Sequence, residues 1–194
     1  TGYDRAIGRS RMPLPYCDGV LQLMQEKGIE KIPQLLPCLW YNAGGAEVDV
    51  RYVYMDVVSG LFAKNFTGQL GDWCRAHQVK LIGHLVEENG AHARLGYGAG
   101  HYFRAVEGMD AAGLDIVCNL YPEQTSGSYY TGFNFFDSDF SHWGLSKMAS
   151  SAACLDPKKK GVTICETFGA YGWNEGLKVM KWITDVLTVR GVNH

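Results

Sequence analysis

Apolar residues recur at helical spacing in four long stretches of the chain. The pattern predicts helices over residues 14–28, 46–78, 139–156 and 173–191, and a helix or an irregular connection over residues 100–113. The second helix is the longest, and one broad apolar stripe runs along it, formed by Val50, Val53, Tyr54, Val57, Val58, Leu61 and Phe62. Such a stripe predicts a helix that packs against a core.

Short apolar runs rich in Val, Leu and Ile lie between these helices. Residues 79–88, 114–122 and 159–169 are each too short for a typical globular helix, which favours buried strands. Residues 192–194 are predicted to begin a fourth strand. Because strands alternate with helices along the chain, the strands are expected to be parallel.

Parallel strand and helix repeats are typical of two architectures, the open doubly wound sheet and the (β/α)8 barrel. The first is usually marked by a Gly-rich phosphate turn, but neither GxGxxG nor GxxxxGK[ST] occurs, and "GYGAG" at residues 96–100 is only a weak signal. The expected fold is therefore α/β of the TIM-barrel type. A full barrel takes about 250 residues, so we expect a single partial domain of about four β/α units over residues 1–194, a fragment of a longer protein.

Composition and charge narrow the expected partners. The chain has 194 residues, is 46% hydrophobic and carries a formal net charge of −2, so it offers no basic surface for nucleic acid or an anionic membrane. No apolar run reaches the roughly 20 residues of a membrane span, and "TGYDRAIGRSRMPLP" at the start lacks a signal-peptide core. Six scattered cysteines without a CxxC pair favour buried free thiols over a disulfide framework or a zinc site, and a cytoplasmic location. We expect no cofactor.

Polar and aromatic side chains cluster where the predicted strands end. In both architectures the carboxyl ends of the strands carry the functional residues. Carboxylates, amides and aromatic rings together are typical of sugar-cleaving sites, in which two carboxyl groups perform the chemistry. The candidates are His84, Glu87, Glu88 and Asn89 at the end of the first strand, Asn119 at the end of the second, Glu166 at the end of the third with Tyr171 and Trp173 close behind, and Asn193 at the end of the fourth.

Glu166 is the strongest catalytic candidate among these residues. It follows Ile164 and Cys165 and precedes Phe168, a setting that predicts a desolvated carboxylate with a shifted pKa. Its expected partner is Glu87, preferred over Glu88 because strand alternation lets only one of these neighbours face inward. The gap between the two carboxyl groups, about 5 Å for retention and roughly 6.5–9.5 Å for inversion, is not determined by the sequence.

Other interpretations of the same residues stay open. Glu166 could be an ordinary solvated loop residue, and Tyr171 and Trp173 could be core rather than sugar platforms. A metal site is not expected, because His84, His92 and His101 fit no standard ligand spacing. A catalytic Cys165 is disfavoured because alternation points it away from Glu166. We expect His84, Asn89, Asn119, Tyr171, Trp173 and Asn193 to bind the substrate.

Two long runs of the sequence resemble a known family. Residues 51–117 and residues 165–194, which begin "CETFGAYGW", are similar to the catalytic barrel of large bacterial glycoside hydrolases of the family 2 type or of the α-L-rhamnosidase-like family 106. The resemblance extends from about residue 34 onward and implies glycosidase activity, with Glu166 as the strand-end glutamate. In the clan of family 2 it would be the nucleophile on strand seven, and the acid/base would lie on strand four, before Thr1.

The missing upstream strands leave two alternatives. Either Glu87 or Glu88 supplies the acid/base, or the chain is an inactive carbohydrate-binding or structural half barrel. Four parallel strands would also leave two unpaired edges, which are an aggregation hazard unless they are paired. We therefore expect a homodimer that closes the barrel, or else a longer polypeptide whose remainder does so.

Overall fold

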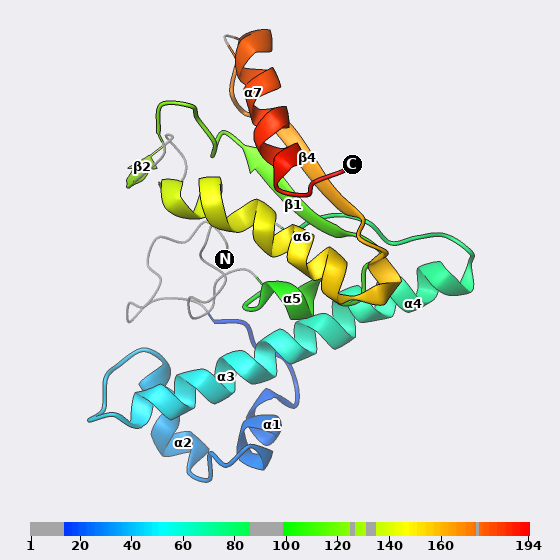
Figure 1. Cartoon of the computed structure of the whole chain (residues 1–194). Coiled ribbons are helices and arrows are strands. Elements are labelled where there is room, and N and C mark those ends of the chain that lie inside the picture. Colours follow the sequence, from blue (N-terminus) through cyan, green and yellow to red (C-terminus); the bar gives the residue numbers. More distant parts are fainter. Residues whose placement is uncertain (1–13, 86–98, 125–126, 131–134, 174) are drawn as a thin grey trace.

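The computed structural model describes residues 14–85, 99–124, 127–130, 135–173 and 175–194 (Figure 1). The N-terminal part is helical, with α1 (Val20–Glu26), α2 (Ile32–Leu35) and a short 3-10 helix, η1 (Leu36–Leu39). None of the helices in these ranges is both long enough and apolar enough to cross a bilayer. All six cysteines are described and are free thiols, but only Cys38 and Cys118 are buried, so the expected burial is wrong for the other four.

One long helix crosses the molecule. It begins as α3 (Ala46–Phe62), passes through the π-helical turn η2 (Ala63–Gly68) and ends as α4 (Gln69–Ala76), which confirms the helix predicted from the apolar stripe. Figure 1 shows α1 and α2 on one side of this helix and the sheet on the other. Val50, Tyr54 and Val57 of α3 are buried against Val20 and Met24 of α1.

Two parallel strands form the centre of the C-terminal half. β1 (Ala112–Val117) pairs with β4 (Thr163–Gly169), and in this register Leu114 lies beside Cys165. α6 (Leu145–Leu155) and α7 (Gly176–Val189) lie over one face of the pair (Figure 1). Because Leu114 and Ile116 pack in one buried cluster with residues of both helices, the intervening residues of β1 point to the opposite, open face.

The remaining elements connect these parts. α5 (Tyr102–Ala105) follows the long helix, and the π-helical turn η3 (Phe140–Gly144) leads into α6, so that the predicted helix over residues 139–156 is confirmed. β2 (Ser128–Tyr130) and β3 (Phe135–Asp137) form a short antiparallel hairpin that the sequence pattern did not predict. A 3-10 turn, η4 (Pro157–Lys159), precedes β4.

The expected partial TIM barrel with four parallel strands is wrong. In the described part of the chain only β1 and β4 pair in parallel. Residues 79–85 approach the start of β1, where the Asp110 N–H donates to the Leu81 carbonyl at 2.7 Å, but the Leu81 N–H donates to the Asp110 carboxylate at 2.9 Å. A side chain thus accepts the bond that a continued strand ladder would need.

The C-terminal segment also falls short of a strand. His194 accepts a hydrogen bond from the Cys165 N–H at 3.1 Å and donates one to the Thr163 carbonyl at 3.0 Å, but residues 192–194 have no strand assignment. The homodimer was expected because four strands would leave open edges. The described residues do not form four parallel strands, so this reason for a dimer no longer applies. The dimer itself stays an untested prediction.

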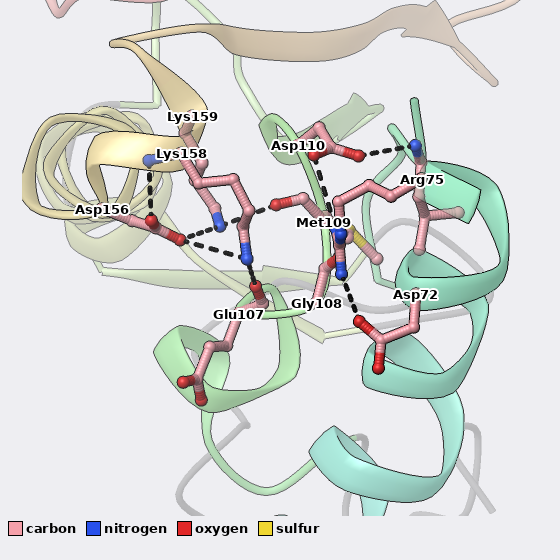
Figure 2. Close-up of polar contacts among 10 residues, drawn as sticks. Asp72, Arg75, Glu107, Gly108, Met109, Asp110, Asp156, Lys158 and Lys159 are labelled. Atoms are coloured by element: carbon pink, nitrogen blue, oxygen red, sulfur yellow. Dashed lines mark hydrogen bonds and ion pairs between the residues drawn. The ribbon is translucent and has the colours of Figure 1, made fainter. Parts of the chain in front are cut away.

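Charged side chains fasten the amino edge of the parallel pair, where β1 and β4 begin (Figure 2). Arg75 of α4 donates to the Gly108 carbonyl at 3.1 Å and forms ion pairs with Asp72 at 2.9 Å and Asp110 at 3.4 Å. Since Asp110 also accepts from Leu81, one network joins α4, the segment after it and the turn before β1.

Lys159, in the turn just before β4, forms further polar contacts at the same edge. Its side chain is 1% exposed, and its Nζ donates to the Met109 carbonyl at 2.9 Å and to Asp156 at 2.6 Å (Figure 2). The adjacent Lys158 reaches the Glu107 carbonyl but remains partly exposed. The buried amine therefore has acceptors from two directions, as a buried charge requires.

Candidate functional site

Glu166 lies in the middle of β4, not at the carboxyl end of the strand as expected, and on the open face of the parallel pair. The preceding residue, Cys165, packs toward the helices, so Glu166 points the other way, and its side chain is 60% exposed. The expected desolvated carboxylate is therefore wrong. Its apolar neighbours in the sequence do not enclose the carboxylate, because neither α6 nor α7 covers the face of β4 from which it projects.

His84 holds the Glu166 carboxylate. Its Nε2 lies 2.7 Å from Oε2 of Glu166, and its Nδ1 lies 2.8 Å from the carbonyl oxygen of Leu85. A carbonyl oxygen can only accept, so Nδ1 carries a proton, and a second proton must lie between Nε2 and Oε2. The pair therefore contains one transferable proton, bound to the imidazole or to the carboxyl group.

A glycine allows His84 to reach this position. A Cβ atom on Gly113 of β1 would lie 1.8 Å from the carbonyl oxygen of Gly83, so any side chain at residue 113 would collide with that backbone. Only glycine permits this close approach. The approach places the residue after Gly83 within reach of β4, the strand on the far side of β1.

Asp115 is a candidate that sequence reasoning missed. In the parallel register it lies beside Glu166, and paired residues of neighbouring strands point to the same face. The Asp115 side chain is partly buried. The available signal was one charged residue between Leu114 and Ile116 in an otherwise apolar strand, which typically indicates a carboxylate with a specific partner or role.

The backbone is unusual at the carboxyl edge, where β1 and β4 end. Cys118, Phe168 and Ala170 have φ angles of 51°, 72° and 60°, in the left-handed region that residues other than glycine rarely adopt. The strand register also shifts between Ile116 and Val117. Strained residues and bulges of this kind concentrate near functional sites.

Two aromatic candidates reach this edge but differ in their surroundings. The Tyr171 hydroxyl accepts from the Leu120 N–H at 3.1 Å and donates to the Leu120 carbonyl at 2.9 Å, and its ring packs edge-on against Tyr121 at 5.2 Å between centroids. These bonds fix Tyr171 to the segment that follows β1. Trp173 is fully exposed, so it is the better placed of the two to stack on a sugar ring.

The structure separates the amide candidates. Asn119 is 2% exposed and lies at the carboxyl edge, where its Nδ2 donates to the Asp115 carbonyl at 3.5 Å. Asn193 lies at the amino edge instead, where its side chain accepts from the Thr163 N–H and donates to the Gly161 carbonyl, both at 3.0 Å. Asn193 is therefore not brought to Glu166. Glu87, Glu88 and Asn89 lie outside the described residues.

Glu175 is the second carboxyl group that sequence reasoning missed. It occupies the N-cap position of α7 but forms no side-chain cap hydrogen bond, and Glu is not among the residues that usually cap a helix. Its Oε1 is buried and has no hydrogen-bond partner among the residues that the structure describes. Burial raises the pKa of the Glu175 carboxyl above its ordinary value.

Comparisons of the chain with protein-family models, with curated proteins and with solved structures gave no significant match. The resemblance of residues 51–117 and 165–194 to glycoside hydrolases therefore stays a prediction. A proposal for function has to rest on the side chains at the open face and the carboxyl edge.

Proposed function

We propose that the protein is a glycoside hydrolase in which Glu166 is the nucleophile or the general base. The observation that carries the proposal is the Glu166 carboxylate on the open face, hydrogen-bonded by His84 at 2.7 Å. A glycosidase needs one carboxylate that is accessible to the sugar and one further carboxyl group that transfers a proton. Glu166 meets the first requirement because more than half of its side chain is accessible.

The chemistry assigns different tasks to the two residues of the pair. Hydrolysis breaks the bond between the anomeric carbon and the departing oxygen, and water supplies the hydroxyl and the proton that complete the products. Glu166 either attacks the anomeric carbon or takes a proton from the attacking water. His84 orients the carboxylate through its Nε2, which lies 2.7 Å from Oε2 of Glu166.

The second carboxyl group has two sources in this chain. Glu87, preferred over Glu88, follows His84 closely in the sequence and was the expected partner. Asp115 is added by the structure, because its position beside Glu166 puts the two backbones at the spacing of neighbouring strands, about 4.8 Å. Substitution of each by its amide separates these candidates, since loss of the acid reduces turnover most for substrates with poor leaving groups.

The proposal is tested with a panel of aryl glycosides. We expect turnover of at least one by the full chain, and a loss of about 10²–10⁴-fold in kcat/KM for Glu166→Gln. Glu30→Gln, an equally conservative change at an exposed residue between α1 and α2, is the matched control and should leave turnover unchanged. The anomeric configuration of the first product, read by NMR, distinguishes retention from inversion.

The outcomes separate the proposal from its alternative. Saturable sugar binding without turnover would reject the hydrolase and favour a carbohydrate-binding protein. Equal turnover by the wild type and Glu166→Gln would remove Glu166 from the chemistry. Because the Glu166 side chain is largely exposed, the substitution should not change the melting temperature, so loss of activity cannot be attributed to unfolding.

A further inference from the structure

A cleft lies beside the amino edge, between the long helix and the turns that precede β1 and β4. Its volume is about 480 Å³, within the range of small-molecule sites, and neither Glu166 nor His84 lines it. Cationic side chains outnumber acidic ones in its walls. Among the described residues, the charged groups that line it are Lys64, Arg75, Arg104 and Lys158, with Asp72 and Glu107 as the two acids. The formal net charge of −2 for the whole chain gave no sign of this local excess.

The turn between α5 and β1 brings two of these cations together. The Lys158 Nζ donates to the Glu107 carbonyl. Arg75 donates to the next carbonyl along the chain, that of Gly108, at 3.1 Å (Figure 2). Because consecutive Cα atoms are only about 3.8 Å apart, both cations are held at one short stretch of backbone. The Glu107 carboxylate forms no ion pair with the described residues, and Figure 2 shows it extending away from both cations.

Close backbone packing holds this turn against the long helix. A Cβ atom on Gly108 would lie 2.1 Å from the carbonyl oxygen of Thr67, and one on Gly71 would lie 2.1 Å from that of Gly108. A side chain at either glycine would therefore push the turn away from the helix. Thr67 belongs to η2, which also carries Lys64, and such π-helical turns are frequent at functional sites.

The cations keep donors for a ligand. Lys64 is exposed and has no hydrogen-bond or ion-pair partner among the residues that the structure describes. Arg75 uses its Nη groups for its bonds, and its Nε–H has no acceptor in the same part of the chain. Asp110 and Asp56, which pair with Arg75 and Arg104, are more buried than these arginines and do not line the cleft. They support the guanidinium groups and leave the cleft side free.

A second cleft continues the first. It has a volume of about 330 Å³, and Glu107 and Lys158 line both. Phe103 and Leu155 supply apolar surface to this second cleft, and they are 41% and 75% exposed. The two clefts together therefore match a ligand with an anionic group at one end and an apolar body at the other.

We propose that these clefts bind an organic phosphate monoester. Its phosphate would accept hydrogen bonds from Lys64, Arg75 and Lys158, and its organic part would lie against Phe103 and Leu155. A phosphate monoester carries about −1.5 to −2 charges at neutral pH, which matches four cations opposed by two carboxylates. Phosphate oxygens also accept well from arginine and lysine. This site is independent of the proposed glycoside hydrolase function.

The test is a binding titration of the full chain with phenyl phosphate, and with inorganic phosphate and phenol as its two halves. Calorimetry and ligand-observed NMR measure the affinity. We expect phenyl phosphate to bind more tightly than either half, and its affinity to fall as salt is added. Lys64→Ala combined with Lys158→Ala should lower the affinity about tenfold or more, as for the loss of hydrogen bonds between charged groups.

A matched control separates the cleft from general charge effects. Lys147→Ala combined with Lys178→Ala removes the same charge from exposed lysines of α6 and α7, and it should leave the affinity unchanged. Leu155→Ala should weaken the binding of phenyl phosphate but not that of inorganic phosphate. Should the Lys64 and Lys158 double variant fail to fold, Lys64→Ala alone decides, because its exposed side chain has no partner to lose among the described residues.

The outcomes distinguish this inference from the hydrolase. Absence of phenyl phosphate binding, unchanged affinity in the Lys64 and Lys158 double variant, or an equal loss in the Lys147 and Lys178 control would overturn the site. Phenyl phosphate that binds no more tightly than inorganic phosphate would overturn its apolar half. Binding that Glu166→Gln preserves, without turnover of any aryl glycoside, would support the site and reject the hydrolase. Turnover by a chain that binds no phosphate monoester would do the reverse.

Discussion

The two edges of the parallel strand pair treat their polar groups in opposite ways. At the amino edge, Arg75 and the buried Lys159 find carbonyl and carboxylate acceptors, and their bonds to the Gly108 and Met109 carbonyls join separate parts of the chain (Figure 2). The buried Oγ1 of Thr163 is the exception at this edge among the described residues. At the carboxyl edge, Asn119 and Glu175 leave buried oxygens without partners. The charged side chains of the amino edge are thus satisfied within the fold, whereas the carboxyl edge leaves buried acceptors unsatisfied at a cost in folding stability.

The carboxyl groups of the two edges also differ in the direction of their pKa shifts. Burial opposes ionisation of Asp156, but the hydrogen bond from Lys159, the Lys158 N–H and the charges of both lysines outweigh it, so its pKa lies below the ordinary value. Burial alone raises the pKa of Glu175 at the other edge. A satisfied carboxylate thus stabilises the folded chain at neutral pH, whereas an unsatisfied one opposes folding there.

The largest expected effect is the loss of the buried amine at the amino edge. Lys159→Ala would leave Asp156 without its closest cation and the Met109 carbonyl without its donor, so the free energy of unfolding should fall by about 3–5 kcal/mol. Urea denaturation measures the change. Lys158→Ala, next to it but partly exposed, is the matched control and should cost no more than about 1 kcal/mol. Equal losses would contradict the assignment of stability to Lys159.

At the open face, where Glu166 and His84 lie, substitution should reduce catalytic activity more than folding stability. His84→Ala removes the donor that orients Glu166, and kcat/KM on the best aryl glycoside should fall about 100-fold, which lies within the range for acid and base catalysis. The free energy of unfolding should change by less than about 1 kcal/mol, because the pair is partly exposed. His77→Ala, at an exposed histidine of the long helix, is the control and should leave turnover unchanged.

Acid should weaken the amino edge. Because the folded pKa of Asp156 lies below its ordinary value of 3.8, its stabilisation is present above that value and is lost as the pH falls through the folded pKa. Asp156→Asn should therefore cost about 1–2 kcal/mol at pH 7 and progressively less below pH 4. Melting curves of both proteins from pH 2 to 7 measure the difference, and a constant cost over this range would contradict the ionic contribution.

The smallest expected effect is a gain in folding stability, caused by substitution of Glu175 at the carboxyl edge. The folded pKa of Glu175 lies above its ordinary value of 4.5, so the folded state binds protons more tightly and loses stability as the pH rises through that window. Glu175→Gln should therefore gain stability relative to the wild type between pH 4 and pH 7, by less than about 1 kcal/mol. A loss of stability in this interval would show that Glu175 has a stabilising partner.

Local patterns determined much of the secondary structure in advance. The helices over residues 46–78, 139–156 and 173–191 follow from periodicity and run length, and so does β4 within residues 159–169. The predicted strand over residues 114–122 overlaps only the second half of β1. These patterns are informative because burial of one face imposes a repeat on the side chains themselves. The sequence likewise singled out Glu166 and His84 as candidates, since polar residues next to apolar strands are few.

Only the tertiary structure decided which candidates meet. An apolar run indicates burial but not strand pairing, and residues 79–85 stay outside the ladder because Asp110 accepts the Leu81 N–H. The strand register placed Asp115 beside Glu166, and the close approach of Gly83 to Gly113 brought His84 to the same carboxylate. The burial of Glu175 Oε1 is likewise not marked in the local sequence. Register, close approach and burial are long-range properties, which no local pattern of residues contains.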